Sequence, residues 1–466
     1  MNFEPLYLRL PIFAQNALCS IYGNRLIARR YNQQYQALEK EIFSREFWSG
    51  EKLREYACQR LQSMITYAAV NVPYYRQLFA SQGIKAEDIH RPEDLSVLPI
   101  IDKGTVQEHR SEFFSEELKR IPHSIVHTSG TTGAGLIFPL SLKAEQEQWA
   151  VWWRYRARFG IDTQTWYAHF YGKSVVPQNQ TKPPFWRINK PGHQILFSAY
   201  HMSDVYLPYY IDELNKRKPL WIQGYPSLLS ILASFMLERG IQLNYQPKVV
   251  TVGAESLLPQ QKALIESAFN TKCRQHYGMT ETVANISECP EGNLHVDEDY
   301  ALVEFIPIDD NSYRIIGTTF TNFAFPLIRY DTGDVAELYE ASSKCSCGRN
   351  GRLVKSIDGR IEDYVLTPDG RRIGRTDHIF KDMINIKECQ ICQDEPSSVV
   401  FRIVRGAKYT NEDERLLLYE ARKRLGNELK IQISYVEKIE RTKTGKLRFV
   451  ISKLAQGKLD RQRKDV

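Results

Sequence analysis

The sequence predicts an α/β protein with a large N-terminal domain of mostly parallel sheets flanked by helices, plus a small α+β C-terminal domain. Three observations support this prediction. Strand-like and helical segments alternate between residues 220 and 277, which is typical of a parallel sheet. The 466 residues exceed the roughly 150 of a typical domain. Near residue 358 the chain changes to short strands and basic helices, with a turn at Asp358-Gly359.

The large domain is expected to begin with helices. Apolar residues recur at helical spacing between residues 44 and 81, until Pro73 and two tyrosines break the pattern. Further on, strands and helices alternate: strand 220–222, helix 227–239, strand 249–252, helix 259–269 and strand 273–277.

The carboxyl ends of parallel strands are where ligands bind in α/β sheets. The residues that follow positions 252 and 277 are therefore candidates for a binding site. They are Gly253, Ala254 and Glu255, and then Gly278, Met279, Thr280 and Glu281.

Composition excludes a disordered chain, because 42% of the residues are hydrophobic and 25% are charged. The net charge is +7, and a basic tail at 438–464 would suit a phosphate-bearing substrate, an acidic membrane or nucleic acid. Such charge runs are usually solvated, and we expect no nucleic-acid partner. Eight unevenly placed cysteines indicate thiols or metal ligands instead of a disulfide framework.

The N-terminal region lacks the pattern of a secretory signal, since Glu4 stands where a positive region belongs. No apolar run approaches the roughly 20 residues that span a bilayer. Residues 10–22 are apolar but short, which favours a peripheral membrane contact or a buried helix. We therefore expect a cytoplasmic protein with no transmembrane segment.

The segment HTSGTTGAG at 127–135 carries the strongest functional signal. Its three glycines let the backbone turn N–H groups inward and its hydroxyl groups add donors, so it can form a nest for phosphate oxygens. No Lys-Ser or Lys-Thr follows the last glycine, which excludes a Walker loop. A flexible turn is the other interpretation. The predicted phosphate-binding residues are Thr128, Ser129, Gly130, Thr131, Thr132 and Gly133.

The sequence TSGTTG resembles the signature loop of the adenylate-forming superfamily, which contains acyl-CoA synthetases, peptide-synthetase adenylation domains and luciferases. Four further segments match in the family's order: YGMTE at 277–281, RYDTGD at 329–334, GRIED at 359–363 and RTKTGK at 441–446. Within the superfamily the chain most resembles the phenylacetate-CoA ligase branch, which includes relatives in capsular polysaccharide synthesis. NVPYYR at 71–76, LPIIDK at 98–103 and CSCGR at 345–349 carry this likeness.

The resemblance implies that ATP and Mg²⁺ are used to activate a carboxylic acid as an acyl-adenylate. It implies that Glu281 binds Mg²⁺, with Thr280 beside it at the α-phosphate. Asp334 would accept hydrogen bonds from the ribose hydroxyls, although a turn aspartate is the plainer interpretation. Residues 253–255 resemble the adenine-facing segment, where Tyr277 can stack on the base. Further nucleotide contacts are expected from Gly278, Arg349 and Arg360.

Lys446 is the predicted catalytic lysine, because a long cation on a mobile loop can join the carboxylate and phosphate oxygens. In so basic a tail, a solvated lysine is the alternative. Glu362 and Asp363 correspond to the family's hinge, so the expected organisation is a domain at 1–357, a hinge at 358–363 and a rotating small domain at 364–466.

The acceptor of the acyl group is less well defined by the sequence. CoA is expected from the family, but LTPDGRRIGRTDHIF at 366–380 stands where a phenylacetate-CoA ligase has a glycine loop that helps to admit CoA. A carrier protein or an amine, including an amino sugar that would be acylated to an amide, is the alternative acceptor. A non-catalytic scaffold on the same fold is a third hypothesis, although every expected catalytic position is occupied.

The acyl pocket is expected to include Tyr171, Gly224, Tyr225 and Pro226. The aromatic residues Tyr167, His169, Phe170 and Tyr171 could also line this pocket, but ordinary burial preference favours a place in the hydrophobic core for them.

Cysteines 289, 345 and 347 and His295 form a predicted structural zinc site. Three thiolates and one imidazole suit tetrahedral zinc. Residues two apart in an extended chain face the same way, so the sulfurs of Cys345 and Cys347 can converge. Relatives in the phenylacetate-CoA ligase branch carry cysteines and a histidine at matching places. The C-x-x-C pair Cys389 and Cys392 is a rival metal or redox site, but alternation in INIKECQICQ predicts a strand that separates the two thiols.

Overall fold

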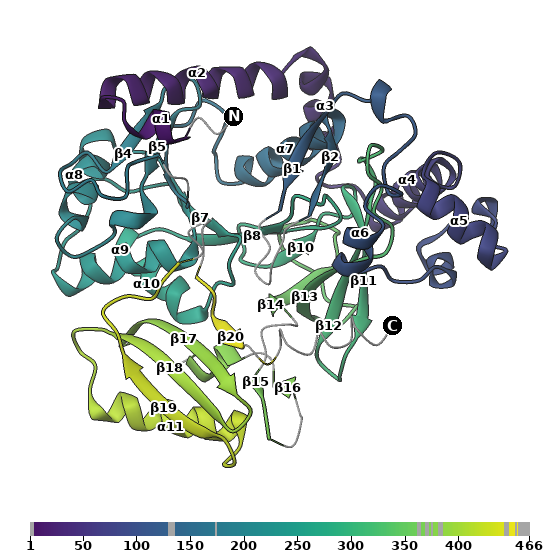
Figure 1. Cartoon of the computed structure of the whole chain (residues 1–466). Helices are drawn as coiled ribbons and strands as arrows, with labels where there is room; N and C mark the ends of the chain where they lie inside the picture. The colour runs from purple at the N-terminus through teal and green to yellow at the C-terminus, as the bar shows by residue number, and fades with distance from the viewer. Residues whose placement is uncertain are drawn as a thin grey trace. The chain divides into compact units, whose positions relative to one another are not determined.

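The computed structural model describes residues 4–128, 136–172, 175–360, 365–368, 372–373, 376–380, 385–441, 447–452 and 454. The chain divides into two compact units that are each assembled from separate stretches. The first unit comprises Met1–Gly23, Gln164–Cys273 and Gly359–Val466, and the second comprises Asn24–Thr163 and Arg274–Asp358. Figure 1 shows the path of the chain through the helices and strands.

A parallel sheet forms the middle stretch of the first unit. Its strands lie in the order β7-β6-β3-β5-β4, and all neighbours pair in parallel except the edge pair β4 and β5. The strands are β3 (Tyr167–Phe170), β4 (Trp186–Asn189), β5 (Gln194–Phe197), β6 (Trp221–Gly224) and β7 (Val249–Gly253). The helices are α8 (Leu207–Arg217), α9 (Pro226–Glu238) and α10 (Pro259–Phe269). The predicted alternation of strands and helices in this stretch is confirmed.

Most residues of these strands are buried, as expected for a mainly parallel sheet. Ile222 in β6 and Val250 in β7 pack in one core with residues of α8, α9 and α10. Helix α9 begins with Pro226 in its first turn, where the missing N–H would have no partner within the helix. Because α9 is apolar nearly all round, it is a buried helix instead of a surface one.

The last stretch of the first unit contains a four-stranded sheet packed against one long helix. Its strands lie in the order β19-β18-β17-β20. Apolar residues that include Ile391 and Phe401 pack with Leu417 of α11 in a core of their own. The elements are β15 (Val365–Leu366), β16 (Arg372–Ile373), β17 (Ile386–Glu395), β18 (Ser398–Arg405), α11 (Asn411–Leu425), β19 (Lys430–Tyr435) and β20 (Val450–Ser452).

The second unit contains mainly antiparallel strands. Seven strands of the described chain lie in the order β11-β12-β13-β14-β10-β9-β8, and β1 pairs with β2 separately. The strands are β1 (His123–His127), β2 (Ile137–Ser141), β8 (Cys273–Gly278), β9 (Asn285–Glu288), β10 (Leu294–Val296), β11 (Ala301–Pro307), β12 (Tyr313–Thr319), β13 (Tyr330–Leu338) and β14 (Leu353–Arg360).

Helices cover the strands of the second unit. The predicted break at Pro73 is confirmed, because α4 ends at Asn71 and α5 begins at Pro73. The α-helices of this unit are α3 (Gln33–Ser44), α4 (Gly50–Asn71), α5 (Pro73–Gln82), α6 (Lys103–Glu108) and α7 (Leu142–Ala157). The first stretch of the chain, in the first unit, contains α1 (Glu4–Leu8) and the start of α2 (Ile12–Arg30). Short 3₁₀ helices occupy Ala86–Asp88, Pro92–Val97, Leu118–Arg120, Ala199–His201 and Thr376–Phe380.

The predicted α/β class, with large sheets and a small C-terminal sheet domain, is confirmed by these layers. Antiparallel pairing in the second unit is a feature that the alternation of strands and helices at 220–277 does not predict. The division at 357 and the hinge at 358–363 stay predictions. Within the described residues, no helix combines the length and the apolar character that crossing a membrane requires.

Candidate active site

Several predicted site residues lie outside the described residues. They are Ser129, Gly130, Thr131, Thr132 and Gly133 of the phosphate loop, Glu362 and Asp363 of the hinge, and the catalytic candidate Lys446. Arg360 is the last residue of β14. The remaining predicted residues have defined positions.

The two ends of the phosphate loop are tied together. Thr128 donates its backbone N–H to the Leu136 carbonyl at 2.9 Å. The Thr128 hydroxyl oxygen accepts the Leu136 backbone N–H, also at 2.9 Å. Because the antiparallel pair of β1 and β2 continues directly from these residues, the loop is closed at its base as a hairpin connection.

The YGMTE segment begins on β8 and leaves it at Gly278. A Cβ at Gly278 would lie 2.9 Å from Asn285 Oδ1 and 3.0 Å from the His276 ring, so only glycine fits there without displacement. Gln148 of α7 donates its side-chain amide to the Met279 carbonyl at 2.8 Å. This contact fixes the backbone before Thr280 and Glu281, whose side chains are half-buried.

Tyr277 and Asp334 bring two of the motifs together within the second unit. The Tyr277 hydroxyl donates to Asp334 Oδ2 at 2.8 Å. Burial first, and then the Asp334 carboxylate, raise the pKa of Tyr277 well above its usual value, so the phenol stays protonated as a donor. Asp334 lies on β13, where its backbone N–H donates to the Thr332 hydroxyl at 3.1 Å.

Strained backbone conformations occur in, or directly after, three of the motif segments. Ala254 has a φ of 65°, Thr282 one of 59° and Arg329 one of 53°, a region that residues other than glycine rarely adopt. The Arg329 guanidinium is held by both carboxylate oxygens of Glu304, at 2.9 and 3.1 Å. Such strain clusters at functional sites, where surrounding contacts maintain it.

Glu255 links the adenine-facing segment to the end of the lysine loop within the first unit. Its Oε1 accepts the backbone N–H of Leu447 at 2.8 Å, and its Oε2 accepts the backbone N–H of Ser227 at 3.2 Å. On the other side of the lysine loop, Arg441 forms an ion pair with Glu388 of β17. Carboxylates therefore hold the residues that flank 442–446 on both sides.

The predicted acyl-pocket residues lie at the ends of the neighbouring strands β3 and β6. The rings of Tyr171 and Tyr225 meet edge to face, with centroids 4.6 Å apart. At Gly224 a Cβ would lie 2.7 Å from the Phe170 Cβ, which explains the glycine at the strand end. The backbone N–H of Tyr225 donates to the Phe170 carbonyl at 3.0 Å. Phe170 itself is buried against Phe197 and belongs to the core.

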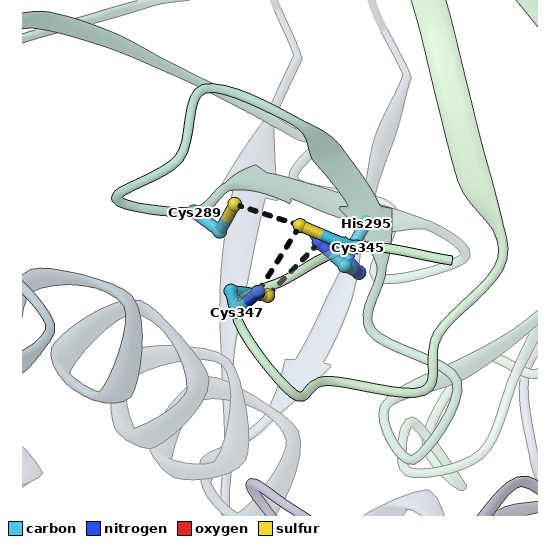
Figure 2. A group of neighbouring side chains, drawn as sticks. All are labelled: Cys289, His295, Cys345 and Cys347. Atoms are coloured by element: carbon cyan, nitrogen blue, oxygen red, sulfur yellow. Dashed lines mark hydrogen bonds between the residues drawn. The ribbon is translucent and has the colours of Figure 1, made fainter. Parts of the chain in front are cut away.

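The four predicted zinc ligands converge in the second unit. Figure 2 shows the side chains of Cys289, His295, Cys345 and Cys347 turned toward one another, and their ligand atoms all lie within 4.8 Å of each other. The turn after β9 places Cys289, β10 carries His295, and the segment between β13 and β14 supplies the other two cysteines. The sulfur of Cys289 lies 3.7 Å from that of Cys345.

The chemistry of this cluster fits a bound metal ion. Burial is the main cause that lowers the pKa of His295 to about 4, so its imidazole is neutral and able to act as a ligand. Burial and the neighbouring thiols raise the pKa of Cys347 to about 12, an effect that a bound cation would reverse. The Asn293 side chain donates to the Cys345 sulfur at 3.2 Å, which is a contact that stabilises a thiolate.

Arg349, predicted to contact nucleotide, lies in a buried ion-pair network. Its Nη2 is 2.7 Å from Asp297 Oδ1, and Arg154 lies 3.0 Å from the same oxygen and 2.8 Å from Asp299. Burial alone would raise the pKa of Asp297, but Arg349, Arg154 and Arg158 hold it well below its usual range. This network has no counterpart in the sequence prediction, because charged residues at buried positions carry no periodic signal.

The rival pair Cys389 and Cys392 lies on β17, as the alternation predicted. Cys389 is buried in the core of the small sheet, whereas Cys392 is half-buried. The only metal-ligand cluster of His, Cys, Asp and Glu found among the described residues is the one around Cys289.

Comparisons with known proteins agree with these motifs. Residues 365–453 match the family described as the CapK C-terminal domain. Protein CapK of Staphylococcus aureus is 27% identical over 456 residues, which cover 96% of this chain and 99% of the relative. A phenylacetate-coenzyme A ligase of Thermus thermophilus is 26% identical over 338 residues, which cover 68% of this chain and 72% of the relative.

Solved structures show the same fold. A 2-hydroxyisobutyryl-CoA ligase in the postadenylation state, in complex with R3-HIB-AMP, matches with a TM-score of 0.68 and 17% identity. The match covers 91% of this chain and 94% of that chain. The ordered motifs and the similarity to CapK and to phenylacetate-coenzyme A ligases support an adenylate-forming ligase that is similar to the phenylacetate-CoA ligase-like branch.

Proposed function

We propose that this ligase uses ATP to activate a carboxylic acid as an acyl-adenylate, releases pyrophosphate and then transfers the acyl group to CoA. The observation that carries the proposal is the hydrogen bond from Tyr277 to Asp334. These residues belong to two motifs that lie 57 positions apart. Glu281 lies close enough to raise the pKa of the same phenol, so base, ribose and metal functions would be grouped in one place.

Each nucleotide role follows from the chemistry of its side chain. Asp334 is an acceptor-only group that suits ribose hydroxyls, and Tyr277 presents an aromatic face to adenine. Carboxylate oxygens are ligands that Mg²⁺ prefers, so Glu281 would hold this ion, with Thr280 beside it at the α-phosphate. Bound Mg²⁺ would neutralise charge on the phosphate oxygens. Lys446 would bring the carboxylate and the α-phosphate together.

Zinc is our proposal for the cluster of Cys289, His295, Cys345 and Cys347. Four protein ligands leave no open coordination position, which is typical of a structural metal. Its role would be to hold the segment between β13 and β14 against the turn after β9.

A role in surface polysaccharide biosynthesis, in the cytoplasm, is proposed from the similarity to CapK along nearly the whole chain. The second candidate function is an amide ligase that passes the acyl group to an amine or an amino sugar. It is favoured by the hairpin of β15 and β16, which stands in the sequence segment that departs from phenylacetate-CoA ligases. Gln393 ties this hairpin to β17 by accepting the Leu366 backbone N–H at 2.8 Å.

Product analysis tests the proposal. The purified enzyme would be incubated with ATP, Mg²⁺ and a panel of carboxylic acids, with CoA, a carrier protein and amino sugars as competing acceptors. Mass spectrometry should detect an acyl-adenylate with at least one acid, and a thioester when CoA is present. An amide product with an amino sugar would replace the CoA assignment by the second candidate. The absence of adenylate with every acid would contradict activation itself.

A further inference from the structure

Helix α2 turns its polar side toward the protein. Asn16 Oδ1 accepts the backbone N–H of Ile188 at 2.8 Å, and the Ser20 hydroxyl donates to the Ile188 carbonyl at 3.3 Å. Ile188 lies on β4, the outermost strand of the parallel sheet in the first unit. Side chains of α2 therefore satisfy backbone groups on the edge strand of this sheet, where β4 is mostly buried.

Further contacts fix α2 in this orientation. Gln15 is buried, and its amide donates to the Leu10 carbonyl at 2.9 Å while its oxygen accepts from the Arg187 guanidinium. Gly23 lies against Asn189, where a Cβ would come within 2.0 Å of the Asn189 Oδ1. If the helix rotated about its axis, a larger side chain would take the place of Gly23 and clash with Asn189. The apolar side of α2 therefore cannot turn toward the protein.

The outward side of α2 is apolar. Phe13, Leu18, Ile21 and Tyr22 are exposed, with 77% of Phe13 and 65% of Ile21 accessible. Leu18 lies three and four positions before Ile21 and Tyr22, so these three are neighbours on the helix surface. Leu6 of α1 is exposed as well. A surface helix normally buries its apolar stripe against the core, and this helix does the reverse. An exposed apolar stripe of this kind marks an interaction surface.

The positive charge near the apolar stripe indicates which kind of surface the stripe contacts. No Asp or Glu occurs between residues 5 and 38, whereas arginine stands at positions 9, 25, 29 and 30. Arg29 and Arg30 pair with Glu145, and Arg9 and Arg25 are exposed. Two copies joined through α2 would place like charges near one another without acidic partners. An anionic surface with an apolar interior would satisfy both the arginines and the stripe.

We propose that α2 lies flat in the interface of an anionic lipid membrane. Phe13 and Ile21 would insert among the acyl chains, and Arg9 and Arg25 would contact lipid phosphates. A helix of 19 residues would extend about 28 Å along the surface, at about 1.5 Å per residue. Exposed apolar residues together with exposed arginines are features of an interfacial helix.

Vesicle co-sedimentation of the full chain tests this proposal. Wild-type protein should bind vesicles of phosphatidylcholine mixed with phosphatidylglycerol about tenfold more strongly than pure phosphatidylcholine, and salt should weaken the binding. The double substitution Phe13→Glu with Ile21→Glu should abolish binding. Val205→Glu with Tyr419→Glu, at exposed apolar residues elsewhere, is the matched control and should retain it.

Three outcomes would overturn the proposal. The first is that wild-type protein does not bind the anionic vesicles. The second is that the control variant loses binding as fully as the α2 variant. The third is that light scattering without lipid shows a dimer that Phe13→Glu dissociates. Arg25→Glu, which leaves the apolar residues intact, provides a second variant and should reduce binding to the anionic vesicles alone. Circular dichroism and the melting temperature of each variant establish that it is folded.

Discussion

The carboxylate of Glu255 accepts a hydrogen bond from the backbone N–H of Leu447, over a distance of 2.8 Å. The two residues are 192 positions apart, and Leu447 directly follows the predicted catalytic Lys446. Ser227 donates its backbone N–H to the other oxygen of the same carboxylate. Glu255 thus connects the start of α9 and the adenine-facing segment to the residue after the lysine.

Glu255→Ala should slow adenylate formation about 10- to 100-fold, because a hydrogen bond to a charged group contributes about 1.5–3 kcal/mol. The loss should appear in kcat more than in the KM for ATP, and Glu255→Gln should restore part of the rate. Glu440→Ala, at an exposed carboxylate beside the same loop, is the control. Steady-state kinetics with unchanged kcat in Glu255→Ala would contradict a positioning role.

Cys345→Ser should remove the metal from the cluster and lower the melting temperature, since a structural site loses affinity when one of its ligands is replaced. Elemental analysis of the purified protein should find about one zinc per chain in the wild type and much less in the variant. Cys392→Ser, at a half-buried thiol of β17, should keep the full zinc content. If wild-type protein contained no metal and still had its native melting temperature, the zinc assignment would be wrong.

Arg154→Met should destabilise the protein by about 3–5 kcal/mol, because it leaves Asp297 and Asp299 buried without one of their cationic partners. Arg54→Ala breaks the exposed pair with Glu93 and should cost less than about 1 kcal/mol. Urea unfolding followed by circular dichroism gives both values. Equal effects of the two substitutions would mean that the buried network contributes little to stability.

Acid should destabilise the protein through His276. Burial is the first cause that lowers the pKa of His276 to about 4, and its Nε2 lies 2.8 Å from Asn285 Oδ1. Below a pH of about 6.5 the unfolded chain binds a proton that the folded protein does not accept until about pH 4. Stability should therefore fall as the pH falls through this window, by up to about 1.4 kcal/mol per pH unit.

The pH dependence is measured by urea unfolding at several pH values between 7 and about 4.5. His276→Gln keeps a side-chain donor for Asn285 and should reduce the slope, whereas His123→Gln, at an exposed histidine, should leave it as in the wild type. An identical slope in wild type and His276→Gln would show that other groups control the acid response.

Local sequence patterns predicted the parts of the fold that depend on local physics. The alternation at 220–277 predicted β6, α9, β7, α10 and β8, because apolar periodicity and glycine or proline punctuation act over a few residues. The cysteines and His295 were predicted as one cluster from their ligand chemistry and from family resemblance, and the strand pairing of β9, β10 and β14 brings them together.

Contacts between distant segments could not be predicted in the same way. Neither the bond between Glu255 and Leu447 nor the pairing of Arg154 with Asp297 has a local signal, since both depend on how remote strands and helices pack. The apolar run at 10–22 left a buried helix and a peripheral contact open. The hydrogen bonds of Asn16 and Ser20 to β4 show that its apolar side faces outward.

The most direct test of the central claim is acid-dependent exchange of labelled pyrophosphate into ATP. The wild-type enzyme should catalyse this exchange with at least one carboxylic acid, and Lys446→Ala should reduce the rate by about 100-fold or more, because the lysine would stabilise charge that develops in the transition state. Lys443→Ala, three residues earlier in the same motif, should retain most of the activity. Undiminished exchange in Lys446→Ala would contradict the lysine's role, and the absence of exchange with every acid would contradict adenylate formation.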